Sequence, residues 1–197
     1  MRRSVLIMPL ALLSCMVDMR QVPGPRSDAA PIWADDRVLY VGSLDLYASD
    51  RAYVADAWRA SMMSVIRSHR IFKNVQRLPA EKNMLAPGYL ILDAELRPTL
   101  DDSYNWWVTW PAVYPLTVYW PVQIRTGKYK IEVTYRIVDQ EGRQILSGIV
   151  KQESEATVYF YGFFRTGSIE RMIETTNLEA MESCAKKIES DIVSPLH

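Results

Sequence analysis

Two stretches of the chain alternate between apolar and polar residues, which is the pattern of a strand that buries one face. In residues 89–98 the even positions are apolar, and the odd positions include Asp93, Glu95 and Arg97. In residues 129–137 the odd positions are apolar, and the Asp-Gln-Glu-Gly sequence that follows them is typical of a turn. The pattern predicts a half-buried strand at 89–98 and a β-hairpin whose second arm is residues 145–154.

Four further elements precede this region. Residues 37–46 are rich in β-forming side chains and predict a strand, and apolar residues recur at helical spacing from 50 to 69. A short strand is predicted at 73–78, and residues 79–87, which begin and end with proline, predict a loop or a single helical turn. The N-terminal half of the domain therefore reads strand, helix, strand.

The C-terminal region has helical periodicity. Ser168 can cap its beginning, and a capping box from Thr176 to Glu179 indicates a break before a last helix that ends at Ile192. Cys184 lies on the apolar face of this pattern, so we expect a buried, unreactive thiol. The complete order predicts an α+β fold, with a single antiparallel-rich mixed sheet and two main helices packed on one face.

The beginning of the chain has the features of a secretory signal peptide. A basic start is followed by a short apolar core and by the sequence Leu12-Leu13-Ser14-Cys15. That sequence resembles the lipobox of bacterial lipoproteins, although Leu13 is bulkier than usual. The resemblance implies removal of residues 1–14, a palmitate-type lipid anchor on Cys15 and, because Met16 follows, attachment to the outer membrane on its periplasmic face. The alternative is an ordinary signal peptide that contains a cysteine.

A tether separates the cysteine from the domain. Residues 15–36 contain three prolines and no sustained periodicity, so the folded domain is predicted to span 37–197. If the tether is extended, its roughly twenty residues reach some 60 Å. The domain could then stand away from the membrane or fold back onto it.

Charge and motif content narrow the function. The chain has 23 basic and 23 acidic residues, so its net charge creates no electrostatic field that would favour binding of nucleic acid. It has two histidines, His69 and His197, and no spacing that indicates a metal site, a phosphate-binding loop or a catalytic triad. The adjacent acids Asp101 and Asp102 predict a solvated turn. We expect a non-enzymatic protein with no cofactor and no metal.

The uncharged stretch from Tyr104 to Ile124 is the strongest candidate for function. It contains four tryptophans, and its three prolines are incompatible with a membrane-spanning helix. Its even positions are apolar, which predicts an aromatic β-ribbon inserted into the domain. The residues proposed to bind a partner protein or the membrane are Trp106, Trp107, Trp110, Tyr114, Tyr119 and Trp120.

Three interpretations of the ribbon remain open. It can cover the core of its own domain, bind a partner protein or the membrane interface, or contribute a barrel stave to an oligomeric pore. A second aromatic segment, VYFYGFF at 158–164, could lie beside it at a shared end of the domain.

The element order also resembles that of a family of periplasmic lipoproteins. The strand VLYVGSLDL, the strand YLILDAEL and the hairpin with VDQEGR at its turn are similar to the fold of the N-terminal domain of TolB. The curli secretion lipoprotein and the lipoprotein activators of penicillin-binding proteins share that fold. The resemblance covers 37–192 and implies an accessory or assembly role in an envelope complex, with an envelope protein as partner. The alternatives are a protomer of a secretion pore, or a lipoprotein partner of a lipid-trafficking transporter.

Overall fold

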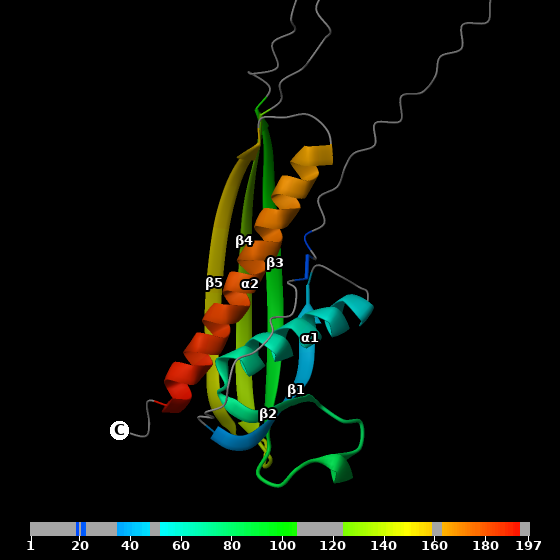
Figure 1. Ribbon diagram of the computed structural model, residues 1–197, viewed down its shortest axis with the longest axis vertical. Helices are drawn as coiled ribbons and strands as arrows, with labels where there is room; N and C mark the ends of the chain where they lie inside the picture. Colours follow the sequence, from blue (N-terminus) through cyan, green and yellow to red (C-terminus); the bar gives the residue numbers. More distant parts are fainter. Residues whose placement is uncertain are drawn as a thin grey trace, which may run out of the picture.

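A computed structural model describes residues 19, 21–22, 35–47, 52–105, 124–158 and 163–193. In this part of the chain, one five-stranded mixed sheet has the order β2-β1-β3-β4-β5, and two helices cover it (Figure 1). The elements are β1 (Asp35–Leu46), α1 (Ala52–His69), β2 (Phe72–Arg77), the 3-10 helix η1 (Lys82–Met84), β3 (Leu90–Asn105), β4 (Ile124–Asp139), β5 (Gln144–Val158) and α2 (Phe163–Val193). The predicted α+β fold and element order are confirmed.

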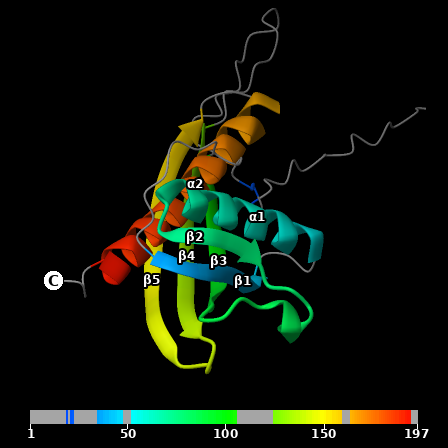
Figure 2. The same ribbon diagram turned by 60° about the horizontal axis from the view of Figure 1, so that its bottom comes forward.

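The sheet combines a parallel unit with an antiparallel meander. β1 pairs in parallel with both β2 and β3, whereas β3, β4 and β5 pair antiparallel in sequence order. α1 packs on β1 and β2, α2 packs on β4 and β5, and both helices lie on the same face of the sheet (Figure 2). The opposite face of the sheet carries no helix among the described elements.

The core lies between this sheet and the two helices. The odd positions of β4 from 129 to 137 and the even positions of β3 from 90 to 96 face the helices and are buried, as the alternation predicts. From the helices, the largest apolar contributions are Trp58, Met62 and Ile66 of α1, and Ile173, Met181 and Ile188 of α2. Apolar burial on this face is what positions both helices.

β3 and β4 are longer than the alternation predicts. β3 ends at Asn105 rather than at residue 98, and its register with β4 is continuous to the pair of Asn105 with Ile124. Asp101 lies within β3, directly opposite Lys128, where opposite charges on paired strands are favourable. The solvated turn predicted at Asp101 and Asp102 is therefore wrong.

α2 is one continuous helix, so the helix start expected at Ser168 and the break expected at Thr176 are both wrong. The hydroxyl of Thr176 donates to the Met172 carbonyl oxygen at 2.8 Å, and Thr175 donates to Arg171 in the same way at 2.9 Å. A threonine hydroxyl that bonds the preceding helical turn sits inside the helix instead of capping it.

The hairpin turn forms where it is predicted. The Asp139 amide donates to the Arg143 carbonyl oxygen at 2.9 Å, and Gly142 has a φ of 78°, which favours glycine. The Asp139 carboxylate accepts hydrogen bonds from the amides of Glu141 and Arg143. Burial acts to raise the pKa of Asp139, but the hydrogen bonds from Arg143 and Glu141 outweigh it, so the pKa is lowered.

Close packing of Tyr135 on Gly148 gives a test of the β4–β5 register. A Cβ atom at Gly148 would lie 2.6 Å from the Tyr135 hydroxyl oxygen and 2.8 Å from its Cζ, and Tyr135 is fully buried. We expect Gly148→Ala to lower the free energy of unfolding by about 1–3 kcal/mol in urea titrations, because the core must shift to admit a methyl group. The neighbouring exposed Ser147→Ala should change it by less than about 0.5 kcal/mol. Equal effects would contradict this packing.

Candidate interaction surfaces

The predicted site residues lie outside the described part of the chain. These are Cys15, the proposed lipid attachment point, and the aromatic residues Trp106, Trp107, Trp110, Tyr114, Tyr119 and Trp120. Of the predicted ribbon, only Tyr104, Asn105 and Ile124 are described. The described residues on either side of the predicted ribbon therefore show only where this segment leaves and re-enters the domain.

The flanks of both aromatic segments meet at one end of the sheet. Asn105 pairs with Ile124, and Arg125 pairs with Val158, while α2 begins at Phe163 at the same end (Figure 1). Segments 106–123 and 159–162 thus leave and re-enter the domain at a common end, as the sequence indicates for its two aromatic segments.

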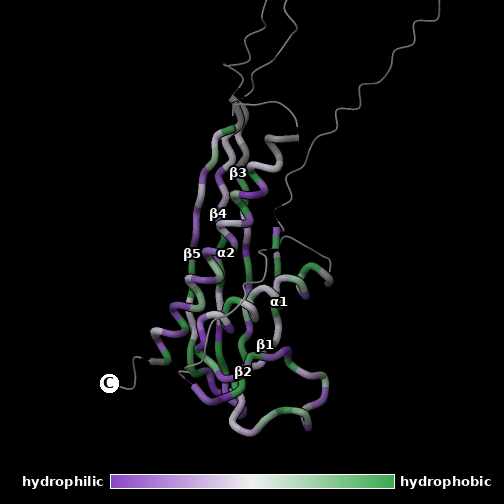
Figure 3. The backbone as a smooth tube through the Cα atoms, viewed as in Figure 1, coloured by the Kyte–Doolittle hydropathy of each residue, from purple (hydrophilic) through white to green (hydrophobic). Residues whose placement is uncertain are grey.

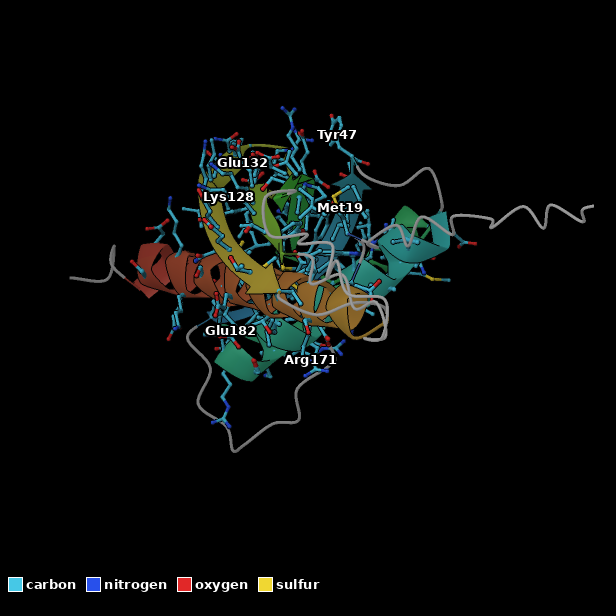
Figure 4. The ribbon with its side chains drawn as sticks, turned by 90° about the horizontal axis from the view of Figure 1, so that it is seen from above. Met19, Tyr47, Lys128, Glu132, Arg171 and Glu182 are labelled. Carbon is cyan, nitrogen blue, oxygen red and sulfur yellow. The ribbon has the colours of Figure 1, made fainter. Side chains whose placement is uncertain are left out.

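A three-stranded stem leads to this end. β1 pairs with β3 only as far as Leu96, so beyond it the sheet consists of residues 97–105, 124–132 and 151–158, which we call the stem. α2 covers one face of the stem. Figure 4 shows Lys128 and Glu132 on the face opposite Arg171 and Glu182 of α2. The stem is a rigid support with one face covered and the other in solvent.

The solvent face of the stem is a network of paired charges. Glu153 binds Lys128 at 2.9 Å and Lys130 at 3.0 Å, and Lys151 binds Glu132 at 2.7 Å. The hydrogen bonds from Lys128 and Lys130 lower the pKa of Glu153. β5 is accordingly hydrophilic along the stem in Figure 3. This face has the character of a solvated surface.

A shallow groove of about 400 Å³ crosses the open face of the sheet below the stem. At its floor, Asp93 Oδ1 accepts from the Ser43 amide at 2.9 Å and from its hydroxyl at 3.0 Å, while Asp93 Oδ2 accepts from Arg136 Nε and Nη2 at 3.2 and 3.1 Å. The carboxylate spans an irregularity in the β1–β3 register, where a Cβ at Gly42 would lie 2.6 Å from Asp93 Oδ1. No motif in the sequence predicts this cluster, and its one local indication is a glycine inside a β-forming run.

A buried polar pair lies on the helix face of the sheet. Tyr129 donates its hydroxyl hydrogen to Asn177 Oδ1 at 2.7 Å, and Asn177 Nδ2 donates to the Gln21 carbonyl oxygen at 2.9 Å. Both side chains are fully buried, and burial raises the pKa of Tyr129 despite the opposing effect of the Asn177 bond. This pair, too, was not among the predicted site residues. Asn177 occupies an apolar position in the helical repeat, four residues after Ile173, and that was the available indication.

The remaining titratable groups of note are a histidine at the end of α1 and a cysteine in α2. Within the described ranges, no group of three or more histidine, cysteine, aspartate or glutamate side chains could hold a metal ion. His69 Nδ1 lies 3.4 Å from Glu189 Oε2, where α1 ends beside α2. Cys184 is fully buried, as predicted, and burial raises its pKa to about 12 against a smaller opposing effect of Lys187. Neither described helix is both long and apolar enough to cross a bilayer.

Comparison with known proteins gives a family match and similar folds. A protein-family model matches residues 6–189, a range that includes Cys15. No curated protein matches the sequence. A solved structure assigned as a neuraminyllactose-binding hemagglutinin homolog from Helicobacter pylori is 11% identical, with 87% of this chain and 95% of that chain covered and a TM-score of 0.50. This similarity shows the fold alone.

Two further structures have lower scores. A minor lipoprotein from Acinetobacter baumannii is 12% identical, with 79% of this chain and 92% of that chain covered and a TM-score of 0.41. The PelC dodecamer from Paraburkholderia phytofirmans is 14% identical, with 84% and 93% covered and a TM-score of 0.41. The solved structures similar to this chain thus include a lipoprotein. The finer resemblance to the TolB N-terminal domain, the curli secretion lipoprotein and the penicillin-binding-protein activators stays a prediction.

Proposed function

The chain belongs to the protein family whose model spans residues 6–189, and from this premise we propose that it is a lipid-anchored accessory protein of an envelope complex. It acts at the periplasmic face of the outer membrane, without catalysing a reaction. The matched range includes Cys15 and most of the apolar segment before it, which supports treating the leader and lipobox as part of what the family shares.

The observation that carries the proposal is the convergence of both aromatic segments on one end of the stem. The pairs of Asn105 with Ile124 and of Arg125 with Val158 fix where these segments leave the domain. Among the described residues, the open face of the stem carries a network of paired charges, which favours the aromatic end as the recognition surface. Tryptophan and tyrosine suit protein interfaces and membrane interfaces, because their rings bury apolar area while keeping a polar tip.

The groove on the open face of the sheet supports a structural role rather than a catalytic one. Both oxygens of Asp93 are bound by Ser43 and Arg136, and this arrangement stabilises the β1 irregularity. A general base needs a free lone pair aimed at a substrate proton. The proposed activity is therefore binding through the segment from Tyr104 to Ile124.

The test is to change Trp110 and Trp120 together to serine. If these rings face a partner protein or the membrane, the melting temperature should stay nearly unchanged, while photo-crosslinking from residue 107 to protein or lipid in cells should be lost. The matched control is Trp58→Ser, because Trp58 of α1 is fully buried in the core and its loss should cost about 3–5 kcal/mol. A double variant that melts as low as Trp58→Ser would instead show that the ribbon covers its own core.

A further inference from the structure

We propose that Tyr129 and Asn177 form a docking site for the tether, and that this dock holds the domain close to the membrane that carries the lipid anchor. We call the two residues the tether dock. The proposal rests on the proposed lipid attachment at Cys15 for its membrane, but the dock itself is read from contacts within the domain.

The contacts are those of a built site. The amide of Asn177 is buried on the core side of α2 and donates to the backbone carbonyl oxygen of Gln21, 156 residues earlier in the chain. The side-chain carbonyl oxygen of Asn177 accepts a hydrogen bond from the hydroxyl of Tyr129 in β4. An asparagine in an otherwise apolar helix face is costly unless both ends of its amide are bound. Within the described residues, Gln21 supplies the acceptor that its NH₂ group uses.

Apolar contacts flank this hydrogen bond. Met19 and Val22, on either side of Gln21, both pack against the hydrophobic core. Because the bond to Gln21 is made to its backbone, the dock fixes the path of the chain, and the neighbouring apolar side chains select its register. Three tether residues therefore behave as part of the folded domain.

The dock changes the length of chain available between lipid and domain. A free tether from Cys15 to the first strand would reach some 60 Å, whereas only four residue steps separate Cys15 from Met19, or about 14 Å when fully extended. The domain is thereby committed to the membrane surface and cannot stand far from it.

The dock lies midway along α2 and in the half of β4 that is nearer to the aromatic end. Asn177 follows Phe163, the first residue of α2, by fourteen residues, which is about 21 Å along the helix. Tyr129 lies five residues from the start of β4 at Ile124, about 17 Å along an extended strand. Because the segment from Cys15 to Met19 is short, docking at this position keeps the end of the stem within reach of the same membrane.

Two insertions of the same sequence distinguish a docked tether from a free one. A ten-residue Gly-Ser segment is placed after Val17, upstream of the dock, or after Asp28, downstream of it. The full lipidated protein is labelled at Ile145→Cys, which is an exposed position, and reconstituted into vesicles of phosphatidylethanolamine and phosphatidylglycerol with a headgroup-linked energy acceptor. The distance from the dye to the bilayer is then measured by energy transfer.

A docked tether predicts unequal results. The upstream insertion should increase the mean distance by about 10 Å, because the root-mean-square length of the flexible segment grows from about 11 Å for four residues to about 21 Å for fourteen, and the downstream insertion should leave it unchanged. Asn177→Ala should raise the distance without any insertion, and Ser183→Ala, which removes a different α2 hydrogen bond to Gln152, should not. Equal increases from both insertions would overturn the proposal, and this comparison stands even if Asn177→Ala does not fold. Failure of the anchor itself is seen separately, as an N-terminal peptide without lipid mass.

Discussion

Replacing Cys15 with serine should transfer the protein from the membrane fraction to the soluble fraction almost completely. Each methylene of an acyl chain contributes about 0.8 kcal/mol of membrane binding, and a single chain binds only marginally, so stable anchoring needs more than one. Serine offers no thiol for acylation, and the described domain has no helix suited to spanning a bilayer. Fractionation of cells, with incorporation of labelled palmitate as a second readout, measures the change.

The other cysteine provides the matched control. Cys184→Ala removes the fully buried thiol of α2 and should leave both palmitate incorporation and membrane attachment intact. If the Cys15→Ser protein kept its label and stayed with the membrane, attachment would have to occur at another residue, and the lipobox interpretation would be wrong.

Periodicity in the sequence was sufficient to predict the three antiparallel strands but not the lengths of these strands. The alternation from Tyr129 to Ile137 fixed which face of β4 is buried, and the strand before it followed the same rule. The prediction ended that strand at Pro98, where the alternation stops, and a proline cannot donate to a sheet ladder. Pro98 lies just beyond the last β1 partner, Leu96, so β3 has a free edge there, and an edge tolerates proline. Edge position is a tertiary property that the local sequence does not contain.

The two errors in α2 have a related cause. The capping patterns rest on Ser168, Thr176 and Glu179. Serine and threonine can cap a helix, but they can also lie inside one, so the residue type alone does not distinguish the two positions. What decides between them is the carbonyl that the hydroxyl reaches, and Thr176 reaches Met172 one turn earlier. Burial of Thr176 against β5, where Ser154 contacts it, keeps the helix continuous through this position.

The tether dock shows a different limit. Composition predicts a tether from the prolines of this segment, but a single backbone carbonyl at Gln21 binding a side chain 156 residues away leaves no local pattern. The indication available in the sequence was on the other partner, since Asn177 interrupts an apolar repeat. An unexplained buried amide predicts that some acceptor exists, although not which one.

In a Cys15→Ser background, the thiol of Cys184 should react with iodoacetamide about a thousandfold more slowly in the folded protein than in the unfolded chain at pH 8. Burial raises its pKa from the ordinary 9.0 to about 12, and the thiolate, which is the reactive form, becomes scarcer by roughly that factor. Exclusion of the reagent from the core slows the reaction further. An exposed thiol introduced as Ile145→Cys provides the fast-reacting control on the same folded domain.

The same shift has a consequence for alkaline stability. Because folding favours the protonated thiol, the stabilisation is fully present below pH 9, the unfolded pKa, and is lost as the pH rises from 9 towards 12. Burial also raises the pKa of Tyr129 and of Tyr135, so both hydroxyls act in the same direction. Urea midpoints should therefore fall between pH 9 and 11, and Cys184→Ala should reduce that fall. Labelling of Cys184 in the folded chain as fast as of Ile145→Cys would mean that α2 does not pack on β4 and β5, and the stem would lose the support on which the proposed recognition end depends.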